Sequence, residues 1–386
     1  MTPWDFPKLF LCCLYSVTFA GASLLFLCLP SRAQDEPKMV ITEDCQAFDI
    51  SSNNAIVYAV PRLKRVKNLI LERDDISVAT GRGQIRHIVE ADKFMPIPPA
   101  AGYVINSLAW SPDGQRIAVN MTLQQPPAGF EAGAPKKKSK DKDREEEDQT
   151  DNEPVQSAEG GKAVALLDAE GHEIHVAGLK SRFLENAGNA TWLADGSNVV
   201  YLTGGPAQIV RVRPSDGNSI TLFEGQAFDD VAWDAARSRA FAIGEGLNVR
   251  RGRALLELDL LRETVRQVAT VENYAGSLSL SPSGRKIAFF EDGDTIEVID
   301  TANPANPAHM RAGFGVFQWS RDELRVLLKR GPADRSNILL WVGLYDGSFT
   351  PALHGLVYRD FKIAPDHASL AITEPGKRVL KLYPLP

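Results

Sequence analysis

Cysteine is scarce in this chain. Only four cysteines occur among 386 residues, and three of them, Cys12, Cys13 and Cys28, lie in an apolar segment near the N-terminus. If that segment is removed, Cys45 is alone and no internal disulfide can form, which excludes a small disulfide-stabilised scaffold. We expect Cys45 to be a small buried hydrophobic residue.

An excess of positive charge is also lacking. The formal net charge is -6 and the isoelectric point is near 5.7. Proteins that bind nucleic acid usually carry a basic domain or stripe that displaces counterions from phosphates. Nucleic acid is therefore not an expected partner. The chain is nevertheless 44% hydrophobic, which is enough for a large core and excludes a disordered polymer.

The common catalytic signatures are missing from the sequence. No Gly-x-Ser-x-Gly nucleophile elbow occurs, and the His-Glu-x-x-His signature of zinc proteases is absent. A fused hydrolase domain is therefore not predicted. We expect no catalytic residue, no metal ion and no cofactor.

The N-terminal segment resembles an export signal. Residues 9–29 carry no charge, Lys8 is the only cation before them, and Pro30 ends the run. Ser31-Arg32-Ala33 then places small residues where a signal peptidase reads them, so cleavage after Ala33 would leave residues 34–386 as the mature domain. The 21-residue apolar run could also span a bilayer, and an uncleaved anchor remains the alternative. Both alternatives predict a periplasmic or secreted location.

A short motif repeats along the rest of the chain. Trp110-Ser111-Pro112-Asp113-Gly114 stands between two apolar runs and reads as a β-hairpin, because Pro, Asp and Gly each favour a position of a tight turn. Seven copies can be aligned. The residues at the position of Gly114 are Asn54, Gly114, Gly196, Arg237, Gly284, Glu323 and His367. The motif residues that we expect to have structural roles are Trp110, Pro112, Asp113, Gly114, Trp192, Asp195, Gly196, Trp233, Pro282, Gly284, Trp319 and Pro365.

The spacing of the copies predicts the architecture. Successive copies lie 60, 82, 41, 47, 39 and 44 residues apart, and four of these six spacings are close to the roughly 40 to 50 residues of a four-stranded propeller blade. Residues 122–160 are almost without apolar side chains, and we expect them to be a disordered, charged insertion within blade 2. Without these 39 residues the 82-residue spacing becomes 43.

The chain ends predict how the ring closes. The last copy supplies only three strands before the chain stops, while residues 39–42 form a strand with no blade of their own. Pairing the two would remove both open sheet edges. The sequence therefore predicts an all-β fold: a seven-bladed β-propeller of four-stranded antiparallel blades, closed by the N-terminal strand in the last blade and expected to be a monomer.

The Trp110-Ser111-Pro112-Asp113-Gly114 hairpin and its copies resemble the WD40-like, TolB-type repeat of secreted bacterial β-propellers. The resemblance implies a rigid disc whose faces and central funnel bind proteins or small ligands. In TolB an α/β domain precedes the propeller, whereas only about a dozen residues separate Ala33 from the first copy here. TolB itself is therefore not expected.

Five carboxylates form a second hypothesis. The entrances to the predicted innermost strands carry Asp44, Asp229, Asp230, Glu272 and Asp360. Acidic groups that converge in a cleft concentrate the electric field, and there they could bind a cation or a basic ligand. The favoured alternative is that they are ordinary solvated loop residues.

Two functions follow from these observations. The leading prediction is an exported, non-enzymatic propeller that serves as a protein-protein interaction module in the cell envelope, with a protein partner of unknown identity. The alternative is a ligand-binding, cation-binding or hydrolytic propeller that uses the five carboxylates.

Overall fold

The computed structural model describes residues 36–66, 69–94, 102–125, 155–156, 158–247, 252–330, 339–353, 358–374 and 379–385. Residues 37–386 form one structural unit. The predicted leader, residues 1–33, lies outside the described residues. Cleavage after Ala33 and retention as an anchor therefore both stay predictions. In the described part of the chain, no helix is long and apolar enough to cross a membrane.

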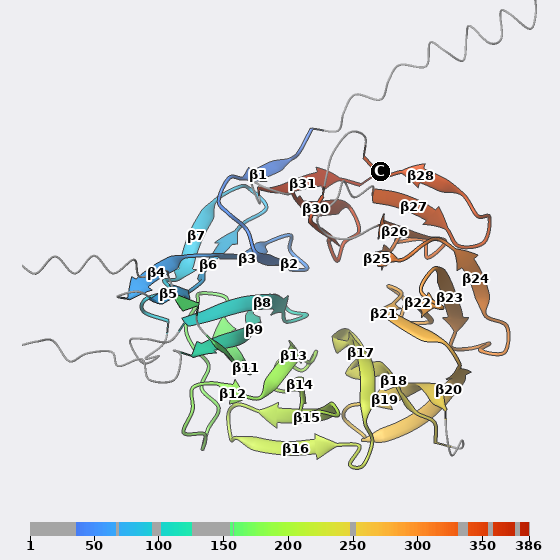
Figure 1. Cartoon of the computed structure of the whole chain (residues 1–386), viewed down its shortest axis with the longest axis horizontal. Coiled ribbons are helices and arrows are strands. Elements are labelled where there is room, and N and C mark those ends of the chain that lie inside the picture. Colours follow the sequence, from blue (N-terminus) through green and yellow to red (C-terminus); the bar gives the residue numbers. More distant parts are fainter. Residues whose placement is uncertain are drawn as a thin grey trace, which may run out of the picture. The chain divides into compact units, whose positions relative to one another are not determined.

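Seven four-stranded antiparallel sheets surround a common centre in residues 37–386 (Figure 1). Each sheet is one blade. From the centre outward, blades 1 to 3 consist of β2 (Ala47–Ile50), β3 (Ile56–Val60), β6 (Asp75–Ala79) and β7 (Ile85–Val89); β8 (Gly102–Trp110), β9 (Arg116–Gln125), β11 (Ala158–Asp168) and β12 (Leu184–Glu185); and β13 (Ala187–Trp192), β14 (Val199–Thr203), β15 (Gln208–Arg213) and β16 (Asn218–Leu222).

Blades 4 to 7 have the same organisation. They consist of β17 (Phe228–Asp234), β18 (Arg239–Glu245), β19 (Arg253–Asp259) and β20 (Thr264–Val271); β21 (Tyr274–Leu280), β22 (Lys286–Glu291), β23 (Thr295–Asp300) and β24 (Ala308–Arg311); β25 (Gly315–Trp319), β26 (Arg325–Arg330), β27 (Leu339–Gly343) and β28 (Phe349–Pro351); and β29 (Asp360–Ile363), β30 (Ser369–Thr373), β31 (Leu380–Pro384) and β1 (Met39–Ile41).

The two ends of the propeller share blade 7, as predicted. β1 pairs antiparallel with β31, so that Met39 lies opposite Leu382 and Ile41 lies opposite Leu380. The backbone N–H of Lys38 extends the pairing by donating to the carbonyl oxygen of Leu382 at 2.8 Å. The seven-bladed all-β fold and its closure by the N-terminal strand are therefore confirmed.

Hydrophobic side chains fill each interface between neighbouring blades. The seven clusters of buried residues correspond one to one with the seven interfaces. Between blades 4 and 5, for example, Phe241 and Leu255 pack with Phe289 and Ile299. The strands are apolar at consecutive positions because both faces of each sheet are covered by a neighbouring blade.

The repeated motif forms the turn between the first and second strands of each blade. In blade 2 the N–H of Gly114 donates to the carbonyl of Ser111 at 2.8 Å, and the other six turns have the equivalent bond. Six of the seven aligned residues have positive φ angles, among them Gly114 at 67° and His367 at 55°. The exception is blade 4, where we aligned Arg237. A 3-10 turn, η1 (Ala235–Arg237), shifts the left-handed position there to Ser238.

The tryptophans of the motif lie at or next to the ends of innermost strands. Trp110, Trp192 and Trp319 are buried, whereas Trp233 is half-buried. In the turns, the carboxylate of Asp113 accepts a hydrogen bond from the N–H of Gln115 at 3.0 Å. Burial raises the pKa of Asp113, but hydrogen bonds from Ser111 and Gln115 and the charge of Arg116 outweigh it, and the pKa lies below its usual value. Asp195 is hydrogen-bonded in the same way in blade 3.

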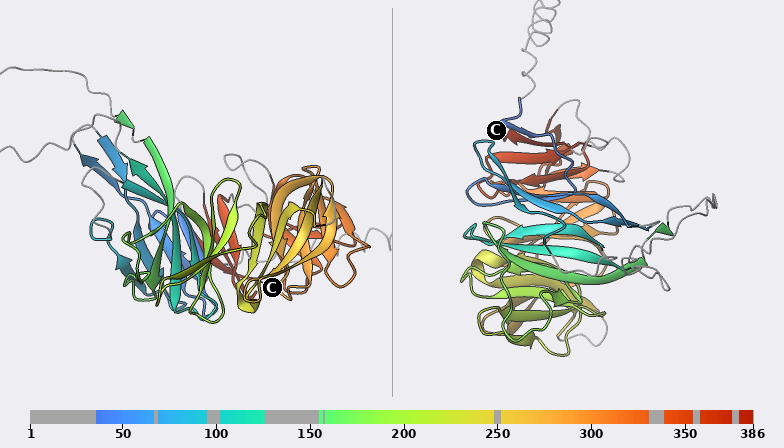
Figure 2. Two further views of the ribbon diagram at one scale, coloured as in Figure 1. Left: turned by 90° about the horizontal axis from the view of Figure 1, so that it is seen from below. Right: turned by 90° about the vertical axis from the view of Figure 1, so that its left-hand side faces the viewer.

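Blades 1 and 2 jointly extend beyond the ring. The hairpin of β4 (Leu63–Val66) and β5 (Leu69–Glu72) is inserted between β3 and β6, and β10 (Val155–Gln156) pairs parallel with β5. Figure 2 shows this small sheet beside the projecting ends of the long strands of blade 2.

The predicted insertion is narrower than residues 122–160. β9 continues to Gln125 and β11 begins at Ala158, since both continue to pair with each other and β9 also pairs with β8. Backbone pairing with neighbouring strands therefore forms strands here, although the low apolar content of these residues did not predict them. Residues 126–154 of the predicted insertion lie outside the described residues.

Candidate functional site

The five predicted carboxylates lie at the end of the innermost strands away from the hairpin turns. Asp229 and Asp230 are in β17, Asp360 begins β29, and Asp44 and Glu272 shortly precede β2 and β21. In the described part of the chain, none of the five belongs to a group of three side chains spaced to hold a metal ion. The structure therefore does not assemble them into the cation site considered from the sequence.

Asp229 and Asp360 lie close to basic side chains. Asp229 forms an ion pair with Arg253 at 2.8 Å, and Asp360 lies 3.7 Å from Arg359 and 3.9 Å from Lys329. Both aspartates are about half exposed.

Asp230 joins two blades. Its Oδ2 accepts hydrogen bonds from the hydroxyl of Tyr274 and, at 3.3 Å, from the N–H of Leu278, both in blade 5. Burial raises the pKa of Tyr274, and its bond to Asp230 adds to the effect, so the phenol stays protonated and continues to donate. Asp44 and Glu272 are exposed to solvent. The acidic end of the innermost strands thus contains paired and bridging groups.

A pocket of about 650 Å³ lies at the opposite, hairpin end of the ring centre. Residues from the turns or inner strands of six blades line it, including Ser51, Pro112, Ala235, Pro282 and Arg321. None of the five predicted carboxylates lines this pocket. We call this end of the molecule the hairpin face.

The acidic side chains that line this pocket are buried, whereas Arg321 is exposed to solvent. Its two acids, Asp49 and Asp234, are 6% exposed. Asp49 is bound by Lys362, and Asp234 is bound by Arg237 at 3.1 Å. Arg321 is exposed and forms no ion pair with any residue that the structure describes. Among the residues that line this pocket, the accessible unpaired charge is therefore positive. At the same face Asp322 is 44% exposed and lies 3.5 Å from Arg325.

A second pocket, of about 440 Å³, opens between blades 6 and 7 and shares Arg321 and His367 with the first. Trp341 forms part of its wall, and the guanidinium of Arg325 stacks 5.2 Å from the centre of the Trp341 ring. Leu385 adds an apolar edge. The two pockets therefore adjoin at Arg321 and His367, and we call them together the recess.

His367 brings an unused polar atom to this recess. Its Nδ1 is buried and has no hydrogen-bond partner among the described residues. Burial lowers the pKa of His367, and the charge of Arg321 lowers it further, while Asp366 and Glu323 act in the opposite direction. The ring is consequently neutral at neutral pH, and its Nδ1 is an unpaired polar atom buried within the protein.

Sequence reasoning missed the recess. Arg321 and His367 belong to two of the weaker copies of the motif, where Arg321 replaces the usual Pro and His367 replaces the usual Gly. These two replacements were the sequence feature that could have indicated a binding site. They gave no indication that the two turns are adjacent across one interface.

No family model matches the sequence, and no curated protein matches it. Among solved structures, the chain is similar to the β-propeller domain of Cps50 (Swd1) from Myceliophteria thermophila, with 12% identity and a TM-score of 0.55 over 90% of this chain and 99% of that one. It is also similar to TolB from Acinetobacter baumannii, with 12% identity and a TM-score of 0.41 over 85% of this chain and 79% of that one. The likeness is one of fold. Membership of the TolB-type family of secreted propellers stays a prediction.

Proposed function

We propose that the protein is an exported, monomeric, non-enzymatic binding propeller of the cell envelope, and that its hairpin face receives an acidic segment of a protein partner. The observation that carries the proposal is the recess, the pair of pockets that adjoin at Arg321 and His367. Propellers are suited to such a role because rigid blades hold turns from distant parts of the chain at one surface.

The chemistry of the recess favours a carboxylate. Arg321 offers a planar group of donors that matches a carboxylate and has no ion pair to give up within the described residues. Asp49 and Asp234 repel an incoming anion little, since both are buried and neutralised by basic partners. Because the whole chain carries a net charge of -6, this local positive charge also restricts where an acidic partner can bind.

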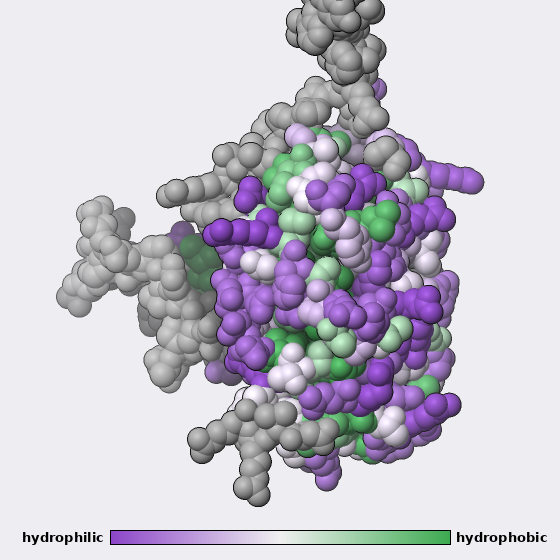
Figure 3. Space-filling model, turned by 90° about the vertical axis from the view of Figure 1, so that its right-hand side faces the viewer, coloured by the Kyte–Doolittle hydropathy of each residue, from purple (hydrophilic) through white to green (hydrophobic). Residues whose placement is uncertain are grey.

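The apolar wall favours a peptide segment over a free inorganic anion. Trp341 and Leu385 provide area for an aliphatic or aromatic side chain beside the cations. Aromatic and arginine residues commonly contribute most to the free energy of protein-protein binding. By contrast, the outer rim seen in Figure 3, on the side where β24 and β28 lie, presents hydrophobic residues as separate patches among hydrophilic ones.

Site-specific photo-crosslinking tests which face binds the partner. A photoreactive residue replaces Leu324, which is 53% exposed in the turn of blade 6, or Glu272 at the opposite end of the ring. In native cells, we expect the Leu324 position to give one discrete protein adduct and the Glu272 position to give none. Equal adducts from both positions would contradict the proposal.

Titration of the purified partner then tests the chemistry. Arg321→Ala should weaken binding by about tenfold to 100-fold, the usual effect of losing a hydrogen bond to a charged group. The matched control is Arg262→Ala, since Arg262 is 84% exposed and lies between β19 and β20, away from the recess. Equal affinities of the two variants would rule out Arg321 as the anchor.

The alternative function, with a ligand or cation held by the five carboxylates, has no supporting observation among the described residues. Asp230 bonds to blade 5, while Asp229 and Asp360 pair with basic side chains. We therefore propose the hairpin face as the binding surface.

A further inference from the structure

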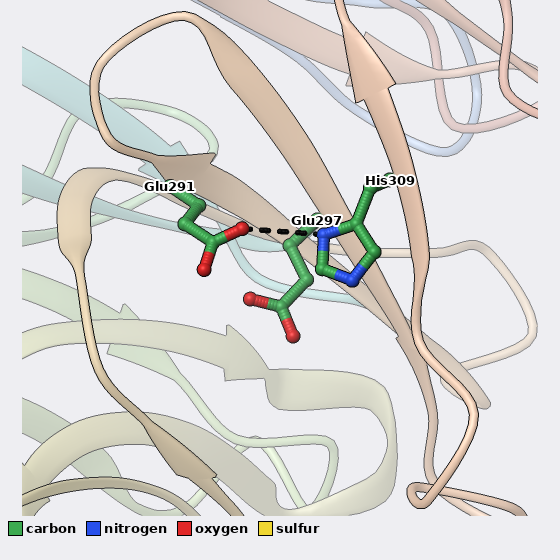
Figure 4. Close-up of side chains that lie close together, drawn as sticks. All are labelled: Glu291, Glu297 and His309. Atoms are coloured by element: carbon green, nitrogen blue, oxygen red, sulfur yellow. Dashed lines mark ion pairs between the residues drawn. The ribbon is translucent and has the colours of Figure 1, made fainter.

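Blade 5 places two glutamates and a histidine on one face of its sheet. Glu297 of β23 lies directly opposite His309 of β24 on one side and Phe289 of β22 on the other. Glu291 is two residues beyond Phe289, so it points to the same face and lies diagonal to Glu297. Figure 4 shows the Glu291 carboxylate facing the His309 imidazole beside Glu297.

The ligand atoms of these three side chains lie close together. One oxygen or nitrogen from each lies within 4.8 Å of those of the other two. The Nδ1 of His309 is 3.2 Å from Oε2 of Glu291. Two ligands at about 2.1 Å from a tetrahedral metal ion are about 3.4 Å apart, so only small side-chain movements would complete a site.

The burial of Glu297 is a separate indication of a bound cation. This residue is 8% exposed, in a strand that is otherwise apolar at its centre, and it makes no hydrogen bond or ion pair with any described residue. A buried carboxylate without a partner is strongly unfavourable. Burial raises the pKa of Glu297 and the nearby Glu291 raises it further, against the opposing effect of His309.

The cation next along β24 does not relieve this charge. Arg311 lies on the same face but pairs with Asp294 at 2.8 Å, and its side chain is 85% exposed. The carboxylates of Glu291 and Glu297 therefore have one exposed imidazole, that of His309, close to both of them. A divalent cation would neutralise both carboxylates.

We propose that Glu291, Glu297 and His309 bind one divalent transition-metal ion of the Zn²⁺ class. Imidazole nitrogen together with carboxylate oxygen suits Zn²⁺ and its neighbours, whereas Ca²⁺ and Mg²⁺ prefer all-oxygen sites with more ligands. Three ligands from the protein leave one tetrahedral position open, and His309 and Glu291 are exposed enough for water or a donor of another molecule to occupy it.

The ion would join three strands of one blade. β24 is the outermost strand of blade 5, and Phe289, on the same face as the three ligands, packs into the cluster shared with blade 4. Binding would therefore fix the rim of blade 5 next to blade 4. This metal site is separate from the recess at the hairpin face. The recess lies near the opposite end of the strands and is lined by different residues.

Calorimetric titration of the metal-free purified protein with Zn²⁺ tests the proposal. We expect one equivalent to bind and the melting temperature to rise, with a weaker response to Ca²⁺. Glu297→Gln and His309→Ala should each weaken Zn²⁺ binding by about 100-fold or more. The matched control is His172→Ala, because His172 also pairs with one carboxylate, Asp168, at 2.9 Å, but lacks the second acid.

Glu297→Gln also separates metal binding from a general loss of folding. Without metal, this variant should melt at a higher temperature than the wild type, since it removes a buried charge, yet it should no longer respond to Zn²⁺. Three results would overturn the assignment: no binding of sub-millimolar Zn²⁺ to the wild type, wild-type affinity in both ligand variants, or tighter binding of Ca²⁺ than of Zn²⁺.

Discussion

The carboxylate of Asp49 in blade 1 accepts a hydrogen bond from the backbone N–H of Trp110 in blade 2, with 2.7 Å between Oδ2 and the nitrogen. A polar side chain crosses each of the seven interfaces in a comparable way. The pairs are Asp49 with Trp110, Asn120 with Ala190, Trp233 with Asn189, Asp230 with Leu278, Trp319 with Ser279, Gln318 with Ile363, and Lys362 with Asp49. These polar contacts are directional, and they therefore fix the angle between blades whose apolar contacts are not.

Asp49→Ala should destabilise the protein by about 1–3 kcal/mol, because it leaves the buried N–H of Trp110 without its acceptor and removes the partner of Lys362, whose side chain is 38% exposed. Urea denaturation measures the change in the free energy of unfolding. Glu224→Ala, which removes an exposed carboxylate from a loop, is the control and should have little effect. Equal stability of the two variants would show that the bridge between blades 1 and 2 is not important.

Ile41→Ala tests the closing strand. Ile41 is 1% exposed and packs with Ile50, Tyr58 and Leu382, so truncating it should lower the free energy of unfolding by about 2–5 kcal/mol. Val40 is 45% exposed on the other side of the same strand, and Val40→Ala should change stability by less than about 1 kcal/mol. Deleting residues 38–44 should lower the melting temperature further than either substitution. An unchanged melting temperature after this deletion would contradict closure through blade 7.

The fold was predictable from the sequence because it repeats. Seven copies of one turn, each requiring a left-handed residue, mark the blades even where Glu323 or His367 replaces glycine. Blade 4 was aligned wrongly by one residue at Arg237, since the sequence did not reveal the 3-10 turn that moves the left-handed position to Ser238. The sequence did not predict that β9 continues to Gln125, because the residues it pairs with, from Ala158 onward, are distant in the chain.

The candidate sites were not predictable in the same way. Asp230 was expected in the loop that enters an innermost strand and lies within β17, and its hydrogen bonds to blade 5 depend on the packing of two blades. Arg321 and His367 meet across one interface, and Glu297 meets His309 through strand register. A lone glutamate in the apolar strand around Ile296 and Val298 was a visible signal, yet its partners are set by pairing that the sequence pattern does not specify.

Gly284→Ala tests the left-handed turn position. Gly284 has a φ of 69°, and an added Cβ would overlap the guanidinium of Arg239 and lie 2.9 Å from a carboxylate oxygen of Asp234. Both effects predict a loss of about 1–3 kcal/mol in the free energy of unfolding. Gly81→Ala is the matched control, because the added Cβ would lie at an ordinary 3.8 Å from the carbonyl oxygen of Asn54. Equal melting temperatures would show that this turn tolerates a side chain.

His367→Asn should make stability less sensitive to acid. Burial lowers the pKa of His367 in the folded state, with Arg321 acting in the same direction, whereas the unfolded chain has the ordinary value of 6.5. Below pH 6.5 the unfolded state therefore binds a proton that the folded state does not, so the free energy of unfolding falls as the pH falls towards the lowered pKa. Above pH 6.5 this contribution is constant.

Asparagine suits the test because it occupies the equivalent left-handed position in blade 1, at Asn54. Urea denaturation at about pH 7.5 and about pH 5.5 should show a smaller loss of stability for His367→Asn than for the wild type. His172→Asn, at an exposed histidine, is the control and should lose as much stability as the wild type. If His367→Asn also lost as much as the wild type, protonation of His367 would not be linked to folding, and its buried Nδ1 would not be the acid-sensitive part of the recess.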